Sequence, residues 1–503
     1  MKELVTSDME KGSSNILDES SMRDDPAMRE ETDEGVPTSN ESQKDASLRE
    51  SLRAIFSWRN YSVYLITAWV YNGFAVIYSY FTIYLREIGW EFIVIGGAMT
   101  AVAGLGALSR FVGGYVGDIT NRKNLAVIAM FMMATYHLII GITTDFIFIV
   151  GALAIYSSFG LVQGGSSAFI MDNIPREHSG LALSLFRMGA SFGILTLLVF
   201  GALEPVMHFD ASVRLIYLVS GIFLVFCAFG RMFFLETGIA NGRKQEKSLW
   251  RDFLSENMRA VRLIKASMPA VLAIVVLDGL SDSIFKFGAL LYTYEFLAFE
   301  IVGINVMLLT PLVISLPLLF RVGRMSDIMG LRRTVLLVYL VMPICAALLM
   351  VAPTYEYWMP LQVVNTADSF LPGLRLVFTT PFLAMVLKYT NDILWGLVLL
   401  TMIQKKMPRT DTSKVLAVFW STVNIIASIG PLIGGLIFEF LEASTLFAIV
   451  LVTNLVILGG VGYYGVDKKE PETLSDRMEL LELAIQEAKN DIDAFRRKRG
   501  LPT

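Results

Sequence analysis

Five charged side chains lie inside two long apolar stretches of this sequence. Asp278, Asp282 and Lys286 are spaced i, i+4, i+8 in one stretch. Lys388 and Asp392 are spaced i, i+4 in another. Residues four apart share one face of a helix, so each group would present its charges on a single side. A charge within a bilayer is costly and therefore faces protein or a water-filled cavity, which predicts a functional site inside a membrane protein.

Two interpretations of these charges stay open. In the first, a desolvated carboxylate binds a proton and couples its movement to a substrate, with Asp278 and Asp282 as leading candidates and Asp392 next. Lys286 and Lys388 would then attract an anionic group of the substrate. In the second, Asp282 or Asp392 pairs with a lysine. That pair would be either a fixed link between two helices or an outer gate that breaks on opening.

Further candidates lie in other apolar stretches. Arg187 lies roughly 10 Å along its predicted helix from Gly180, at about 1.5 Å per residue. It could bind a substrate anion, or its side chain could extend to the cytoplasmic face. Tyr71, Asn72 and Gln163 are neutral polar residues of the first and fourth predicted helices. They suit the binding of a small organic solute and suit ordinary packing between helices equally well.

The composition indicates what kind of element carries these residues. Of 503 residues, 54% are hydrophobic and only 17% are charged, whereas soluble domains usually carry about a quarter charged residues. Many apolar runs are about 20 residues long, which matches the ~30 Å hydrocarbon core of a bilayer. The alternating pattern of membrane β-strands is absent. We therefore expect an all-α membrane protein.

Twelve stretches are predicted to be transmembrane helices. In order they span residues 60–85, 92–116, 125–143, 146–171, 180–202, 212–234, 267–293, 301–320, 333–352, 378–403, 415–438 and 444–464. Between the ninth and tenth, the semi-polar segment 353–376 is either a short interfacial helix or an external loop.

These helices divide the chain into five predicted segments. They are a disordered acidic cytoplasmic tail (1–55), a six-helix bundle (56–235), a cytoplasmic linker (236–266), a second six-helix bundle (267–465) and a cytoplasmic helical tail (466–503). In the last tail, apolar residues spaced 3-4-3-4-3 predict a helix that either docks on the protein itself or forms a coiled coil.

Lysine and arginine indicate the orientation of the chain. They are concentrated in the loops on one side of the predicted membrane, which is typical of the cytoplasmic side. We therefore expect a multi-pass protein of the cell membrane with both termini in the cytoplasm, and we expect it to be a monomer.

One loop motif occurs twice, after the second and after the eighth predicted helix. Each copy has a glycine, an Asp-Ile pair four residues later, a turn residue and two cations. The shared positions are Gly114, Asp118, Arg122 and Lys123 in the first copy and Gly323, Asp327, Arg332 and Arg333 in the second. The aspartates are expected to hold a helix N-terminus or a nearby cation. Such a hairpin could fasten two helices in one conformational state and release them in another.

Small residues in the two loops carry further expectations. Gly114 and Gly323 are expected to let neighbouring helices approach closely. Asn121 and Gly330 occupy the turn position, and both residue types tolerate a positive φ.

The repeated loop resembles the signature hairpin of the major facilitator superfamily, Gly-x-x-x-Asp-(Arg)-x-Gly-Arg-Arg/Lys. The first copy fits in place. In the second copy the cations come one residue late, and isoleucine replaces the usual arginine after aspartate in both. The resemblance covers roughly residues 55–465. It implies twelve transmembrane helices in two pseudo-symmetric six-helix bundles, with helices 1, 4, 7 and 10 lining a central cavity between them.

A second motif of this superfamily occurs in a different helix from usual. The Gly-Pro-x-x-Gly-Gly sequence common in the fifth helix of drug/proton antiporters of this superfamily is found at residues 430–435, in the eleventh predicted helix. The fourth helix also lacks the buried arginine that is common in proton-coupled members. These departures disfavour a drug antiporter, although the glycines still suit close helix packing.

Other classes of function find no support in the sequence. There is no phosphate-binding Gly-x-x-x-x-Gly-Lys-Ser/Thr loop, no metal-ligand spacing and no nucleophile–base arrangement, so neither an enzyme nor a cofactor is expected. A net charge of −4 does not favour nucleic-acid binding.

We predict a secondary active transporter that moves a small organic solute across the lipid bilayer by alternating access, coupled to H+. The alternatives are a facilitated uniporter and a non-transporting receptor or scaffold.

Overall fold

The computed structural model describes residues 48–172, 182, 185–186, 188–236, 257–265, 269–406 and 412–464. The C-terminal tail and most of the predicted N-terminal tail and linker lie outside these residues. The last part of the predicted disordered tail, residues 48–55, instead belongs to helix α1 (Leu48–Ser57). By its internal contacts the chain forms two units, Met1–Ala54 and Ile55–Thr503. The second unit holds all the predicted membrane helices.

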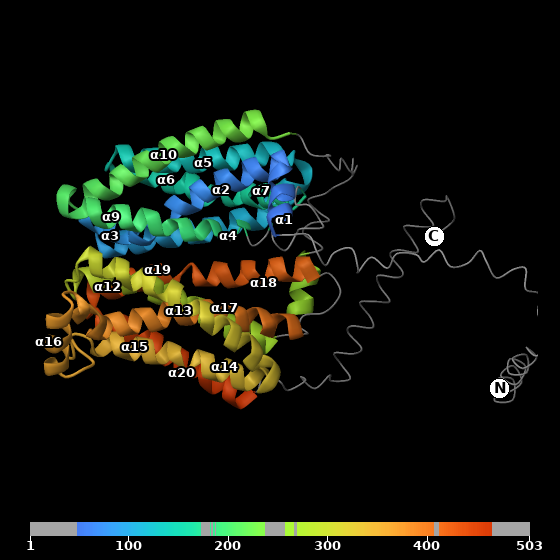
Figure 1. Ribbon diagram of the computed structural model, residues 1–503. Helices are drawn as coiled ribbons and strands as arrows, with labels where there is room; N and C mark the ends of the chain where they lie inside the picture. The colour runs from blue at the N-terminus through green and yellow to red at the C-terminus, as the bar shows by residue number, and fades with distance from the viewer. Residues whose placement is uncertain are drawn as a thin grey trace, which may run out of the picture. The chain divides into compact units, whose positions relative to one another are not determined.

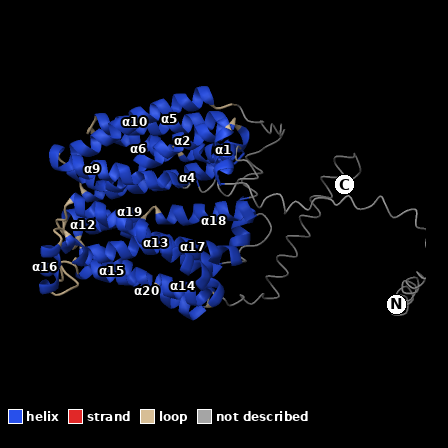
Figure 2. Cartoon of the chain, viewed as in Figure 1, coloured by secondary structure: helices blue, strands red, loops and turns tan. Residues whose placement is uncertain are grey.

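Helices account for nearly all of the first half of this unit (Figures 1 and 2). After α1 (Leu48–Ser57), they are α2 (Arg59–Ala75), η2 (Val76–Tyr80), α3 (Phe81–Glu87), α4 (Phe92–Ile119), α5 (Arg122–Ile142), α6 (Phe146–Ser158), α7 (Gly160–Asp172), η4 (Gly189–Phe192), α9 (Gly193–Met207) and α10 (Phe209–Phe234).

The second half is built in the same way. Its helices are α12 (Pro269–Glu295), α13 (Ile301–Ile328), α14 (Leu331–Tyr339), α15 (Val341–Val351), α16 (Leu361–Phe370), η5 (Leu374–Phe378), α17 (Thr380–Lys406), α18 (Thr412–Ala427), α19 (Gly430–Phe440) and α20 (Ser444–Tyr464). Within the described residues no strand forms, and one isolated bridge joins Tyr357 to Thr379.

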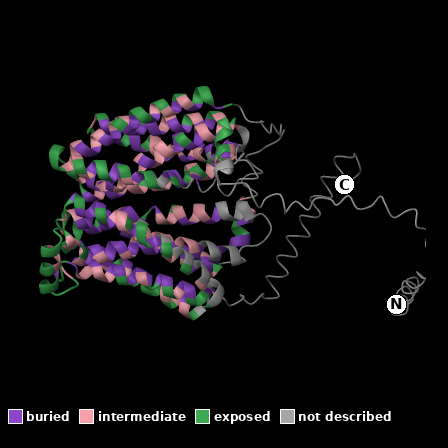
Figure 3. Cartoon of the chain, in the orientation of Figure 1, coloured by how far each residue is buried: buried purple, intermediate pink, exposed green. Residues whose placement is uncertain are grey.

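The all-α membrane architecture is confirmed. Every one of the twelve predicted ranges contains described helix, and the segment 353–376 contains the short helix α16. Eight helical stretches of the described residues are long and apolar enough to cross a membrane, and nine if the bent pair Asn257–Lys265 and Pro269–Glu295 is one span. Exposed side chains on these helices include Phe226 and Ile147, and such an apolar surface suits lipid (Figure 3).

Among the described residues, the fully buried core shared by the two halves lies toward one end of the helices, which we call the cap end because α16 lies there (Figure 1). A buried cluster at this end combines residues of both halves, including Tyr80, Phe81, Phe285 and Tyr292. At the opposite end, which carries the α4–α5 and α13–α14 turns and which we call the hairpin end, the fully buried clusters belong to one half each.

Several polar and aromatic contacts across the two halves also lie at the cap end. Arg86 Nε lies 3.2 Å from Glu295 Oε1. Tyr80 donates a hydrogen bond to the Asn305 side chain. The ring of Phe92 stacks on the ring of Phe296 at 5.8 Å between centroids. These contacts between the halves are individual side-chain interactions, each of which can break separately.

Gly114 behaves differently from the prediction, while the surroundings of Gly323 are outside the described set, so its role stays a prediction. A Cβ built on Gly114 would meet nothing within 4 Å, so this residue allows no close approach. The approach is made by its neighbour Gly113 against the backbone of α7 and by Gly117, whose Cβ would lie 3.2 Å from Gly165. Gly113 and Gly117 are four apart and share the face toward α7, whereas Gly114 is rotated about 100° away from that face.

The turn residues also differ from each other. Gly330 has φ +82°, as predicted. Asn121 instead has φ −60° and caps α5, because its side chain accepts a hydrogen bond of 2.9 Å from the Lys123 backbone N–H.

Among the charged residues of the hairpins, Arg332 donates to the carbonyl of Gly462 and so links α14 to α20. The side chains of Asp118 and Asp327 are outside the described set, so their roles stay predictions.

The displaced glycine string forms the tightest contact between the halves, where α19 crosses α4. A Cβ on Gly96 would lie 2.5 Å from the Pro431 carbonyl oxygen, and a Cβ on Gly435 would lie 2.5 Å from the Phe92 carbonyl oxygen. Thr100 Oγ1 accepts a hydrogen bond of 2.9 Å from the Leu432 backbone N–H. Close packing by the string is therefore confirmed at Gly435.

Replacing Gly96 by alanine should destabilise this arrangement. The added methyl group would meet backbone atoms of α19, which cannot move aside as a side chain can, so we expect a cost of about 1–3 kcal/mol. Thermal unfolding of the purified protein in detergent would show it as a lower midpoint temperature.

The matched control is Gly97→Ala on the next residue of α4, where a Cβ would meet nothing within 4 Å. Alanine favours helix over glycine, so this variant should be as stable as the unchanged protein or more so. Equal losses in the two variants would contradict the contact.

Candidate functional site

Four of the predicted charges form one cluster between α12 and α17. Lys388 Nζ lies 2.7 Å from Asp282 Oδ1 and also bonds Asp392, one turn along its own helix. Lys286 Nζ lies 2.6 Å from Asp282 Oδ2 and 3.6 Å from Asp392 Oδ2. Two lysines and two carboxylates thus balance in charge, and each lysine contacts both carboxylates.

The two lysines of the cluster differ strongly in how far they are buried. The Lys388 side chain is 3% exposed and packs over the ring of Phe285, 4.9 Å from its centroid. The Lys286 side chain is 50% exposed. Asp392 Oδ2 is buried without a hydrogen bond, and Lys286 Nζ lies 3.6 Å from it. Lys388 therefore depends on these carboxylates, whereas Lys286 is accessible from outside the cluster.

Asp278 stands apart from the lysines although it is on the same helix. It is 8% exposed and makes no ion pair among the described residues. Its Oδ1 receives a hydrogen bond of 2.9 Å from the Tyr339 hydroxyl, and its Oδ2 receives one of 2.7 Å from Trp395 Nε1. Neutral donors on α14 and α17 therefore hold this carboxyl group, where the sequence spacing alone suggested a shared face with Lys286.

A chain of hydrogen bonds continues from Asp278. The Tyr339 hydroxyl also lies 2.9 Å from Asn454 Oδ1 on α20, and Ser281 Oγ lies 3.0 Å from the same amide oxygen. Tyr339, Trp395 and Asn454 carry no distinguishing pattern in the sequence, so periodicity alone does not find them.

The number of hydrogens available shows that this hydrogen-bond chain has two alternative arrangements. A tyrosine hydroxyl has one hydrogen and cannot donate to both Asp278 and Asn454. If Asp278 is protonated, it donates to Tyr339, and Tyr339 donates to Asn454. If Asp278 is ionised, Tyr339 donates to it, and the Asn454 amide turns so that its NH2 group donates to Tyr339. The two arrangements differ by one proton on Asp278.

The remaining predicted residues lie in the first half. Tyr71, Asn72 and Gln163 line one cavity of about 130 Å³ together with Arg231 of α10. Arg231 stands in the last turn of its helix, where a cation usually extends to the membrane surface, so its sequence position alone does not indicate a buried site. Arg187 is outside the described residues, and its role stays a prediction.

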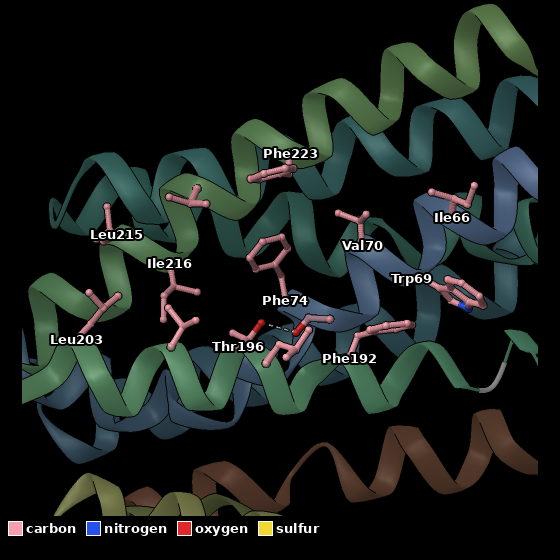
Figure 4. A pocket seen from close by; sticks show the side chains of 14 residues that line it. Ile66, Trp69, Val70, Phe74, Phe192, Thr196, Leu203, Leu215, Ile216 and Phe223 are labelled. Atoms are coloured by element: carbon pink, nitrogen blue, oxygen red, sulfur yellow. Dashed lines mark hydrogen bonds between the residues drawn. The ribbon is translucent and has the colours of Figure 1, made fainter.

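A larger hollow of about 640 Å³ opens between α2, α9 and α10 (Figure 4). Its walls are almost wholly apolar, with side chains such as Trp69, Phe74 and Phe223. The one hydroxyl in it, on Thr196, already donates to the Gly73 carbonyl at 2.8 Å. This hollow offers no group that could orient a polar solute or carry a proton.

No group of three potential metal ligands occurs among the residues described here. The residues predicted for the substrate or proton pathway that the structure describes fall into three places: the α12–α17 cluster, the Asp278 chain and the cavity beside Arg231.

The charge cluster predicts a specific pattern of stability. Lys388→Met should destabilise the protein by about 3–5 kcal/mol, because it leaves a buried carboxylate without compensation. Adding Asp392→Asn should recover part of the loss, since Lys286 and Asp282 then remain as a neutral pair. Unfolding midpoints in detergent for the single and double variants measure this coupling.

Lys286→Met is the matched comparison. It also leaves one carboxylate unbalanced, but the Lys286 side chain is 50% exposed and that of Lys388 is 3% exposed, so its loss should cost less than that of Lys388. A double variant less stable than Lys388→Met alone would contradict the cluster as an energetic unit.

Comparison with solved structures shows a shared fold. The nucleoside transporter NupG aligns with a TM-score of 0.59 at 12% identity, over 79% of this chain and 97% of that one. A POT family transporter in complex with 5-aminolevulinic acid aligns with a TM-score of 0.57 at 13% identity, over 83% and 97%. A D-xylose-proton symporter aligns with a TM-score of 0.54 at 14% identity, over 83% and 99%.

Among curated protein sequences no match is found. The sequence profile described as Major Facilitator Superfamily matches residues 41–391, well over half of the 503 residues. With this match, the helical membrane architecture and the fold shared with solved transporters, the chain belongs to the Major Facilitator Superfamily of membrane transporters.

Proposed function

We propose that this protein is a proton-coupled secondary transporter that moves a small organic solute by alternating access. The observation that carries the proposal is the buried carboxyl of Asp278, which has no cation partner among the described residues and lies at one end of a reversible hydrogen-bond chain. A group of this kind can gain or lose a proton without breaking an ion pair that the fold requires.

Alternating access is supported by the way the two halves meet. The predicted bundles 56–235 and 267–465 would be the two moving bodies. Among the described residues, their shared fully buried core lies toward the cap end, where the polar contacts are few. At the hairpin end the partly buried Phe111 of α4 packs against the core of the other half. Two packed bodies joined at one end can rock so that the opposite end closes while the first opens.

The location of the charge cluster narrows its role. Asp282, Lys286, Lys388 and Asp392 all belong to the second bundle, so a rocking motion between bundles does not separate them. We therefore favour two roles over an outer gate. The cluster fastens α12 to α17, and its lysines present positive charge once a carboxylate takes up a proton.

The orientation follows from the positive residues of the loops. The hairpin end would face the cytoplasm together with both termini, and the cap end would face outward. In this arrangement the structure has its outer side closed. We expect the protein to act as a monomer in the cell membrane.

Proton flux across proteoliposomes tests the coupling. External pH is recorded while nucleosides, D-xylose and dipeptides are added in turn, because these resemble the cargo named for the structural neighbours. At least one solute should enter together with protons in the unchanged protein. Asp278→Asn should lower the solute-driven proton flux at least tenfold, since an amide cannot exchange the proton.

The matched control is Asp145→Asn. Asp145 caps α6 by accepting from the Ile147 backbone N–H at 2.9 Å, and asparagine caps equally well, so flux should be unchanged. Solute flux without proton movement, equal in all three proteins, would favour a facilitated uniporter. Solute binding with no flux at all would favour a receptor on the transporter fold.

A further inference from the structure

The first bundle contains a second site that differs in charge from the Asp278 region. We propose that the cavity beside Arg231 binds a small oxyanion, a carboxylate or phosphate group, between α2, α5, α7 and α10. The proposal concerns binding and does not require that the bound group be transported.

Arg231 is buried without an opposite charge. It is 3% exposed, and no described carboxylate forms an ion pair with it. Its Nε donates to Thr67 Oγ1 at 2.8 Å, and its Nη1 donates to the Ala126 carbonyl at 2.9 Å. The ring of Tyr64 lies 4.1 Å from its Cζ atom. Two of its five N–H groups thus meet neutral acceptors, and others remain for a ligand.

This environment lowers the cost of the buried cation without neutralising it. Neutral acceptors and an aromatic face each supply part of the solvation that water would give. They leave a full positive charge inside a membrane protein, where charges usually pair with one another or serve a ligand. A guanidinium with free N–H groups is suited to two-point contact with a carboxylate or phosphate.

The polar residues around the cavity point to the same ligand class. The Tyr71 hydroxyl and the amides of Asn72 and Gln163 line the cavity and make no hydrogen bond to described residues. By contrast, Tyr64 and Ser166, on the same wall, bond each other at 2.8 Å. Three polar groups without a described partner, beside one cation without a described counter-charge, make a site suited to an acceptor carrying negative charge.

The size of the cavity sets a limit. About 130 Å³ holds several waters or one carboxylate or phosphate group, and it is too small for a whole nucleoside or disaccharide. The anion would therefore be small and free, or it would be the charged end of a larger solute or of a lipid whose remainder lies outside.

Thermal unfolding of the full-length protein in detergent tests the site. Inorganic phosphate, succinate and glycerol 3-phosphate are titrated at constant ionic strength balanced with sodium chloride. A ligand that binds only the folded state raises the unfolding midpoint in proportion to its affinity. We expect at least one of the three to raise it saturably, and Arg231→Gln to weaken that binding at least tenfold.

Two further variants guard against misfolding and nonspecific charge effects. Gln163→Glu places a carboxylate in the cavity as an internal partner for Arg231, so the protein should stay folded but lose the anion-dependent shift. Arg214→Gln removes another arginine of α10, which donates to the Ile142 carbonyl at 3.0 Å, and should bind the anion like the unchanged protein.

A second experiment distinguishes a soluble anion from a lipid headgroup as the ligand. The same proteins in nanodiscs of zwitterionic or anionic phospholipid would reveal a lipid headgroup as ligand, if only anionic lipid stabilises the protein and Arg231→Gln removes the effect. The proposal is overturned if neither soluble anions nor anionic lipid shift the midpoint. It is also overturned if the shift is the same in Arg231→Gln and Gln163→Glu as in the unchanged protein.

Discussion

The cost of placing charge in a hydrocarbon environment is the constraint on which this structure depends. Three buried charged or chargeable groups meet it in different ways. Lys388 is surrounded by carboxylates and an aromatic ring. Asp278 accepts hydrogen bonds from two neutral donors. Arg231 donates to neutral oxygens and packs on a tyrosine. The charge of Lys388 is balanced by carboxylates, whereas Asp278 and Arg231 have no opposite charge among the described residues. A proton on Asp278, or an anion beside Arg231, would supply the missing charge.

The two halves use the same helical plan for opposite charges. The second half buries a carboxyl group that can be neutralised by a proton, and the first half buries a guanidinium that stays charged at any accessible pH. In the proposed mechanism, one half would therefore respond to the proton gradient and the other would recognise negative charge. Among the described residues, neither region relies on the other for its hydrogen bonds.

Motion between the halves requires contacts that are close yet separable. Glycine against backbone at the α4–α19 crossing gives a tight fit without interlocking side chains. The neighbouring ion pair of Arg86 with Glu295 is about one-third exposed on each side, so water can replace it at little cost. The charge cluster, in contrast, lies within one bundle and strengthens that bundle as a body.

The sequence by itself determined the helices and much of their chemistry. Runs of about twenty apolar residues specify membrane helices because backbone groups must pair within the segment. The spacing of Asp282, Lys286, Lys388 and Asp392 placed two charge pairs on helix faces, because that geometry is local. The partners of Asp278, the burial of Arg231 and the choice of Gly113 over Gly114 were decided only by the tertiary structure. They depend on how each helix is rotated against its neighbours, and a periodicity of 3.6 residues fixes a face without saying what that face meets.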